Sequence, residues 1–203
     1  MRTHHFLTPA VLILAACGVD NTTGPLGPNG GENRVVITVG DAPLDVDGVS
    51  LLARSSTSAV ELRFSGSVDP IKEAVDDEYG IDLSIVLDRP ALEALSAPVD
   101  LVVAGSSAFS GSATTGQLEV TWTPTAASSS VVQEVLVTRG CFCANLGSGT
   151  QTANGKLTFT ALREGSVTGH LELVVTGDVL NYTGSQSIAF DVDFDLALQP
   201  QNN

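Results

Sequence analysis

Basic residues are scarce in this chain: 9 Lys and Arg stand against 23 Asp and Glu, which gives a formal net charge of −14 at pH 7. A protein this acidic has no basic stripe that could bind a phosphate backbone, so nucleic-acid binding is excluded as a function. Histidine is also rare, with 3 in 203 residues, and two of these are His4 and His5. Zinc hydrolases with two or three histidine ligands are therefore excluded by number.

The motifs of several enzyme classes are missing as well. The sequence contains no Gly-rich phosphate loop, metalloprotease helix, dinucleotide fingerprint or Gly-x-Ser-x-Gly nucleophile turn. Aromatic residues make up only 5%, but a hydrophobic content of 43% is too high for a disordered chain. With 20 Gly and 9 Pro, we expect one folded, turn-rich domain, and we predict neither catalytic residues nor a cofactor.

The first 16 residues are typical of a secretory signal peptide. Arg2 supplies a positive start, and the apolar run over residues 6–16 is well short of the roughly 20 residues that a membrane-spanning helix needs. The run ends in Leu14-Ala15-Ala16-Cys17, which resembles the lipobox of bacterial lipoproteins. The resemblance covers residues 1–17 alone and implies a modification and a location, not an activity.

In that family the cysteine becomes the first residue of the mature chain and carries a diacylglycerol and usually an acyl chain such as palmitate. The resemblance implies this lipid on Cys17, and two or three acyl chains give stable anchoring. Gly18 in place of Asp favours the outer over the inner membrane in the family's best-known sorting rule. The implied location is the cell envelope, with a membrane partner held through lipid. The alternative is an ordinary secretory signal with a chance cysteine at its cleavage site.

The segment after Cys17 reads GVDNTTGPLGPNGGEN up to residue 33. Its Gly, Pro and Asn content without apolar periodicity is typical of a flexible linker. Such a linker has a root-mean-square reach of roughly 22 Å and a ceiling of about 55 Å. We therefore divide the chain into a signal peptide (1–16), an acylated cysteine with a linker (17–33) and a single domain (34–203).

Apolar and polar residues alternate along most of this domain. Val60, Leu62 and Phe64, for example, alternate with charged residues, as expected for strands with one buried face. Short turns and the lack of crossover helices favour antiparallel pairing, and only residues 90–95 look helical. We predict an all-β fold, an antiparallel β-sandwich of about nine strands, with a closed β-barrel as the alternative. The expected strands are 35–39, 60–64, 81–87, 99–103, 118–122, 131–137, 157–159, 167–175 and 188–198.

His170 is the only histidine outside the signal peptide, so every histidine-dependent mechanism must use it. In its expected strand, His170 shares one face with Thr168 and Glu172, opposite Leu171 and Leu173. We interpret it as an exposed surface histidine beside a carboxylate. The alternative is a hydrolase that uses His170 as its base.

Cys141-Phe142-Cys143 is the most unusual motif of the domain. Once Cys17 is acylated, an even number of cysteines remains in an oxidising compartment, which favours a disulfide. Cα atoms two residues apart in a straight strand are roughly 6.6 Å apart, near the limit for a disulfide, so the bond requires a turn or bulge. The alternatives are free or partner-bonded thiols and a redox or metal site.

Acidic residues gather in three groups, which are Asp41, Asp45 and Asp47; Asp76, Asp77 and Glu78; and Asp191, Asp193 and Asp195. Asp45-Val46-Asp47-Gly48 is a fragment of a calcium loop that lacks the remaining acids. The last group alternates with apolar residues, which indicates the solvated face of a strand. We interpret all three as groups that increase solubility and protect sheet edges, and we predict no metal site. Trp122 has the parity of apolar neighbours, which favours the core over sugar stacking.

Taken together, these features predict a lipid-anchored, non-enzymatic β-domain of the cell envelope that serves as a binding, adhesion or structural module for a protein or glycan ligand. A hydrolase or a thiol-redox or metal-binding protein that uses His170 or the Cys141 and Cys143 pair is the second hypothesis. A calcium-stabilised carbohydrate-binding module is the third.

The cysteine pair generates a prediction. If Cys141 and Cys143 are bonded to each other, protein purified without reductant should show no alkylated cysteine by mass spectrometry and should stay monomeric on non-reducing gels. Because the ring is small, reduction should lower the free energy of unfolding by only about 1 to 2 kcal/mol. Two alkylated cysteines in the native protein would contradict the disulfide.

Overall fold

The computed structural model describes residues 27–40, 42–43, 48–68, 79–112, 117–126, 130–140, 148–177 and 186–201. These residues form eleven strands and one short helix. The strands are β1 (Arg34–Val39), β2 (Ala42–Pro43), β3 (Gly48–Ser55), β4 (Ala59–Val68), β5 (Tyr79–Asp88), β6 (Val99–Ser112), β7 (Gln117–Pro124), β8 (Val132–Gly140), β9 (Ser148–Arg163), β10 (Ser166–Gly177) and β11 (Gln186–Pro200), and the helix is α1 (Arg89–Glu93).

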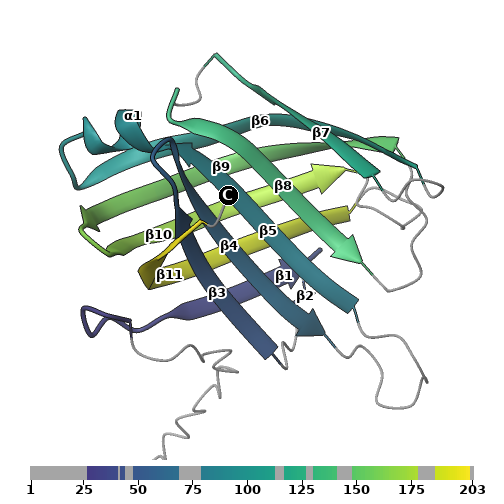
Figure 1. Cartoon of the computed structure of the whole chain (residues 1–203). Helices are drawn as coiled ribbons and strands as arrows, with labels where there is room; N and C mark the ends of the chain where they lie inside the picture. The colour runs from purple at the N-terminus through teal and green to yellow at the C-terminus, as the bar shows by residue number, and fades with distance from the viewer. Residues whose placement is uncertain are drawn as a thin grey trace, which may run out of the picture.

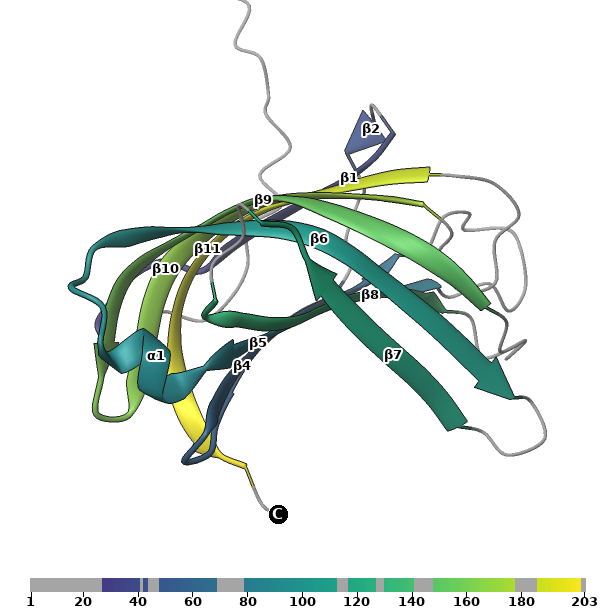
Figure 2. The same ribbon diagram turned by 90° about the horizontal axis from the view of Figure 1, so that it is seen from above.

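The strands form two layers that face each other across the core (Figures 1 and 2). One layer has the order β7-β6-β9-β10-β11, with β1 on β11 and β2 on β1, and the other has the order β3-β4-β5-β8. Strand β11 belongs to both, because it pairs with β1 up to Asp193 and with β3 from Leu198 onwards. The fold is all-β and resembles a sandwich, as predicted, and the path of strands ends at β7 and β8 without closing into a barrel.

Two details differ from the prediction. The pairing of β11 with β3 is parallel, whereas all other paired strands of the described residues are antiparallel. Parallel neighbours need a long connection, and here most of the domain lies between the two strands.

Strands β2 and β3 were not predicted. In β3, Leu52 follows Leu51 and hides the alternation of Val49, Leu51 and Ala53.

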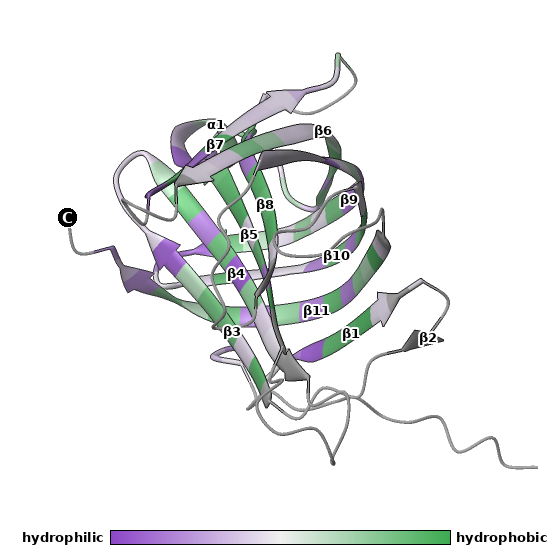
Figure 3. Cartoon of the chain, turned by 90° about the vertical axis from the view of Figure 1, so that its right-hand side faces the viewer, coloured by the Kyte–Doolittle hydropathy of each residue, from purple (hydrophilic) through white to green (hydrophobic). Residues whose placement is uncertain are grey.

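The core consists of the inward-facing residues of both layers, and apolar and polar residues alternate along strands such as β1 and β11 (Figure 3). Val60, Leu62 and Phe64 are all fully buried, as their alternation predicted. Phe64 of β4 meets Phe194 of β11, with ring centroids 5.8 Å apart, and so joins the two layers. Trp122 is partly buried and packs against this core.

Helix α1 lies in the segment that was predicted to be helical. The Asp88 side chain caps it by accepting a hydrogen bond from the Ala91 backbone N–H at 2.8 Å, and Pro90 lies in its first turn. Leu92 is 1% exposed and attaches the helix to the core. The helix therefore covers one end of the sandwich, beside the β9–β10 hairpin.

At the open side of the sheet, the edge strand β8 is paired with a side chain. Gln151 of β9 is 2% exposed, and its carboxamide bridges the layers to the backbone of Val137. The Val137 N–H donates to Gln151 Oε1 at 3.2 Å, and Gln151 Nε2 donates to the Val137 C=O. The buried N–H and C=O of Val137 therefore both have hydrogen-bond partners, as they would beside a neighbouring strand.

Replacing Gln151 by Leu should keep the volume but leave both backbone groups of Val137 without a partner. Because unpaired buried polar groups are costly, we expect the free energy of unfolding in urea to fall by about 2 to 4 kcal/mol. Gln117→Leu, on the exposed part of β7, is the matched control and should change it by no more than about 0.5 kcal/mol. Equal effects of the two substitutions would contradict the role assigned to Gln151.

Candidate functional site

The outer face of β11 holds the acidic residues Asp191, Asp193 and Asp195, each of which lies directly opposite a polar residue of β10. Their partners in register are Glu172, His170 and Thr168, respectively. On the other side of β11, Arg34 of β1 lies opposite Asp193. The sheet thus brings residues from three strands together on one face, although they are far apart in the sequence.

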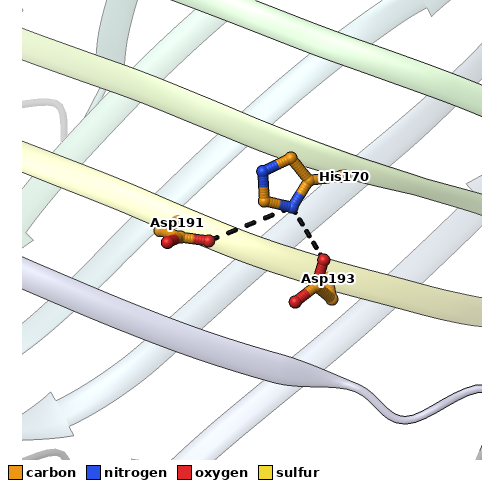
Figure 4. A group of neighbouring side chains, drawn as sticks. All are labelled: His170, Asp191 and Asp193. Carbon is orange, nitrogen blue, oxygen red and sulfur yellow. Dashed lines mark hydrogen bonds and ion pairs between the residues drawn. The ribbon is translucent and has the colours of Figure 1, made fainter.

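Figure 4 shows how His170, Asp191 and Asp193 lie relative to one another. His170 Nδ1 is 2.7 Å from Asp193 Oδ1 and 3.9 Å from Asp191 Oδ1. An ionised carboxylate can only accept hydrogen bonds, so the Nδ1 of His170 carries a proton and donates a hydrogen bond to Asp193. The other ring nitrogen, Nε2, is 3.7 Å from Glu172 Oε1. The imidazole is therefore surrounded by three carboxylates, and its side chain is 30% exposed.

Arg34 binds the same two aspartates from the opposite side. Its Nη2 is 2.6 Å from Asp191 Oδ1, and its Nε is 2.9 Å from Asp193 Oδ2. The hydrogen bond to Asp193 is the main reason why the pKa of Arg34 lies above its ordinary value. Burial raises the pKa of Asp193, but hydrogen bonds from Arg34 and His170 outweigh burial and place that pKa below its usual range.

These contacts refine the interpretation of His170. The sequence predicted one carboxylate neighbour, Glu172, and the structure adds Asp191 and Asp193 from the adjacent strand. The side chain is partly covered, so the description of His170 as simply exposed was too coarse. In the part of the chain that the structure describes, the recorded partners of His170 are carboxylates, and a hydroxyl or thiol nucleophile is not among them.

Asp195 corrects a second expectation, because this residue is only 2% exposed instead of solvated. Its carboxylate accepts hydrogen bonds from the backbone N–H of Asn29 at 2.9 Å and of Gly31 at 3.0 Å. It also accepts from the Asn29 side chain at 2.7 Å and from the Thr168 hydroxyl at 3.3 Å. Residues 27–33, which were assigned to the flexible linker, thus form a turn that covers Asp195.

The backbone of Asp195 is also satisfied by this turn. The Asp195 N–H donates to Asn33 Oδ1 at 2.6 Å, and Asn33 Nδ2 donates to the Asp195 C=O at 3.4 Å. Gly27 and Gly31 make the close approach possible. A Cβ atom on Gly27 would lie 2.1 Å from the Asp195 carbonyl oxygen, and one on Gly31 would lie 3.0 Å from Asp195 Cβ. We call residues 27–33 the docked turn.

A cleft of about 460 Å³ lies between α1 and the β9–β10 hairpin. Leu92, Leu95, Phe159 and Leu162 form its apolar part, and charged residues line its rim. The rim residues include Arg89, which is paired with Glu93 at 2.7 Å. Because Leu92 and Phe159 are almost fully buried, the accessible lining is mostly polar and charged, which suits a polar ligand with a small apolar part.

The other residues singled out in the sequence lie outside the described residues. This applies to Cys17 and to Cys141 and Cys143, and also to the first two acidic groups, which are Asp41, Asp45 and Asp47, and Asp76, Asp77 and Glu78. The disulfide and calcium hypotheses therefore stay predictions. Asp191 and Asp193, from the third group, are bound in the ion-pair cluster.

Comparison of the chain with models of protein families, with curated protein sequences and with solved structures gave no significant match. The function must therefore be argued from the residues. The described residues include no helix of the length and hydropathy needed to span a bilayer.

Asp195 generates a prediction for stability and its pH dependence. Burial raises the pKa of Asp195, but the hydrogen bonds from the docked turn and Thr168 lower this pKa by a larger amount. The pKa of Asp195 therefore lies below its ordinary value. The folded protein thus favours the ionised form. The contribution of ionised Asp195 to the free energy of unfolding is fully present above the ordinary aspartate pKa of about 3.9. It is lost as the pH falls through the lower pKa that Asp195 has in the folded protein.

We therefore expect Asp195→Ala to lower the free energy of unfolding by about 2 to 3 kcal/mol at pH 7. Its stability should also depend less on pH than that of the native protein between about pH 5 and pH 2. Urea denaturation across this range measures both quantities, with Asp100→Ala, an exposed carboxylate of β6, as the control. A loss no greater than that of the control would show that Asp195 does not hold the docked turn.

Proposed function

We propose that this chain is a lipid-anchored, non-enzymatic protein of the cell envelope whose β-domain acts as a binding, adhesion or structural module. The observation that carries the proposal is the docked turn. It attaches the last part of the expected linker to one place on β11, through three hydrogen bonds to a single carboxylate. The expected tether therefore leaves the domain at one fixed place beside β11.

The docked turn shortens the free part of the tether. If Cys17 carries the lipid, residues 18–26 are all that separate the anchor from Gly27, and they can span at most about 30 Å. The formal charge of the domain is strongly negative, and anionic headgroups repel such a surface. The lipid is then the attachment to the membrane, and the short tether keeps the domain near it.

The cleft beside α1 supports a binding role for the domain. Its volume of about 460 Å³ lies within the range of small-molecule sites, roughly 300 to 1,000 Å³. The apolar side chains in the cleft would contact a ligand's hydrophobic part, while Arg163 and Glu164 on the rim would contact its polar part. A flexible protein segment or a glycan with an apolar face has this chemistry.

The test of the proposal is Cys17→Ser in cells of a bacterium that processes lipoproteins. The native chain should incorporate radiolabelled palmitate and sediment with membranes, whereas the variant should lose the label and appear in the soluble fraction. Cys141→Ser is the matched control and should keep both the label and the membrane location. Equal labelling and sedimentation of native and Cys17→Ser protein would overturn the lipid anchor.

A further inference from the structure

Four potential metal ligands form a rectangle on the outer face of the sheet. His170 and Glu172 lie two residues apart on β10, and their direct partners on β11 are Asp193 and Asp191. Side chains two residues apart on a strand point to the same face, and direct cross-strand partners have Cβ atoms about 4.5 to 5.5 Å apart. The backbone of two paired strands therefore holds all four side chains in one small area.

The charges of this cluster do not balance. Three carboxylates, from Glu172, Asp191 and Asp193, lie near two permanent cations. Arg34 binds both aspartates, and Lys156 of β9 lies directly opposite Glu172, which leaves one negative charge uncompensated when His170 is neutral. These side chains are only partly exposed, with 46% for Asp191 and 44% for Asp193. Glu172 is more exposed still, at 61%. Solvent therefore screens part of the excess charge, and the remainder attracts a further cation.

The ligand atoms are also close enough to share one ion. One atom each from His170, Asp191 and Asp193 lies within 4.8 Å of the other two. Around a tetrahedral ion with bonds of about 2.0 to 2.1 Å, ligand atoms are about 3.3 Å apart, so rotations of the side chains suffice to close the site. Glu172 Oε1 lies 3.7 Å from Nε2, the ring nitrogen that faces away from the two aspartates, so a fourth position around an ion on Nδ1 belongs to water.

Arg34 leaves one oxygen of Asp193 accessible, whereas it binds Asp191 at Oδ1, the oxygen that lies 3.9 Å from the imidazole. It approaches Asp193 at Oδ2 from the β1 side, whereas His170 faces Oδ1 of the same carboxylate from the β10 side. One carboxylate can therefore bind the guanidinium with one oxygen and an ion with the other. Hydrogen bonds of this kind commonly orient carboxylates that bind metals.

We propose that His170, Asp191 and Asp193 bind a divalent transition-metal ion of the zinc class, with water in the fourth position. The imidazole decides the class, because calcium and magnesium prefer sets of oxygen ligands, whereas nitrogen and oxygen together suit zinc and its neighbours. Binding at Nδ1 requires the neutral imidazole to carry its proton on Nε2, so the Nδ1 proton is lost to solvent as Nε2 takes one up, and a neutral ring releases no net proton. The site goes beyond the proposed function, since none of its residues belongs to the anchor or the linker.

The imidazole itself provides the readout. In a full-length chain carrying His4→Gln and His5→Gln, His170 is the only histidine, so ¹³C at its Cε1 gives a single imidazole signal in NMR spectra. The protein is prepared without a histidine tag and treated with chelator. Zn²⁺ should move this signal to a new position that saturates at one equivalent for the site, and Ca²⁺ or Mg²⁺ at about 1 mM should leave it in place.

Two variants and a control complete the test. Asp193→Asn and Asp191→Asn should each raise the Zn²⁺ concentration needed for half of the change by about tenfold or more. Asp82→Asn removes a carboxylate that is paired with Arg63 at 3.4 Å on the other layer, and it should have no effect. Far-ultraviolet circular dichroism confirms that each variant is folded.

The proposal is overturned if Zn²⁺ up to about 1 mM leaves the His170 signal unchanged. It is also overturned if Ca²⁺ gives the same change as Zn²⁺, or if both aspartate variants respond like the native cluster. Because the signal belongs to His170 alone, metal bound by cysteine thiols does not mimic the expected result. The outcome is independent of the lipid anchor, which the Cys17→Ser experiment tests separately.

Discussion

Backbone N–H and C=O groups that are buried without a neighbouring strand set the constraint on this structure, because each such group costs free energy unless another donor or acceptor replaces the missing strand. The sheet ends at β7 and β8, and the ladder between β1 and β11 ends at Asp193. Gln151 supplies both partners for Val137 at the first place, and Asn33 supplies both for Asp195 at the second. The carboxamides of Gln151 and Asn33 thus make the backbone hydrogen bonds that a residue of a neighbouring strand would otherwise make.

The hydrogen bonds between Asn33 and the Asp195 backbone allow β11 to take part in both layers. Strand β11 pairs with β1 over Ile188–Asp193 and with β3 over Leu198–Pro200, and Asn33 covers the interval between them. Since β11 is held on both sides, its outward side chains have defined surroundings. Three aspartates at alternate positions consequently have three different roles: Asp195 binds the docked turn, Asp193 binds both Arg34 and His170, and Asp191 binds Arg34.

The strand content could be predicted because alternation is a local property. The segments around Phe64, Leu83 and Leu171 carry it over at least five residues, and each is a strand with one buried face. Strand β3 was missed because Leu52 obscures the alternation, and β2 is too short to carry a pattern. The docked turn was missed because its Gly, Pro and Asn residues also describe a flexible linker. The one sequence feature that indicates the docked turn is Asn33 directly before β1, together with Asp195 between apolar residues of β11.

By itself, the sequence determined the all-β class, the apolar face of most strands, the acidic charge and the presence of a single histidine after His5. It could not determine which strands become neighbours, because pairing between β10 and β11 or between β1 and β11 depends on contacts between segments far apart in the chain. Only the tertiary structure decided that Arg34, His170, Asp191 and Asp193 share one surface and that Asp195 is buried. The physical reason is that alternation tells which side of a strand faces the core, whereas the surroundings of an outward side chain depend on its cross-strand partners.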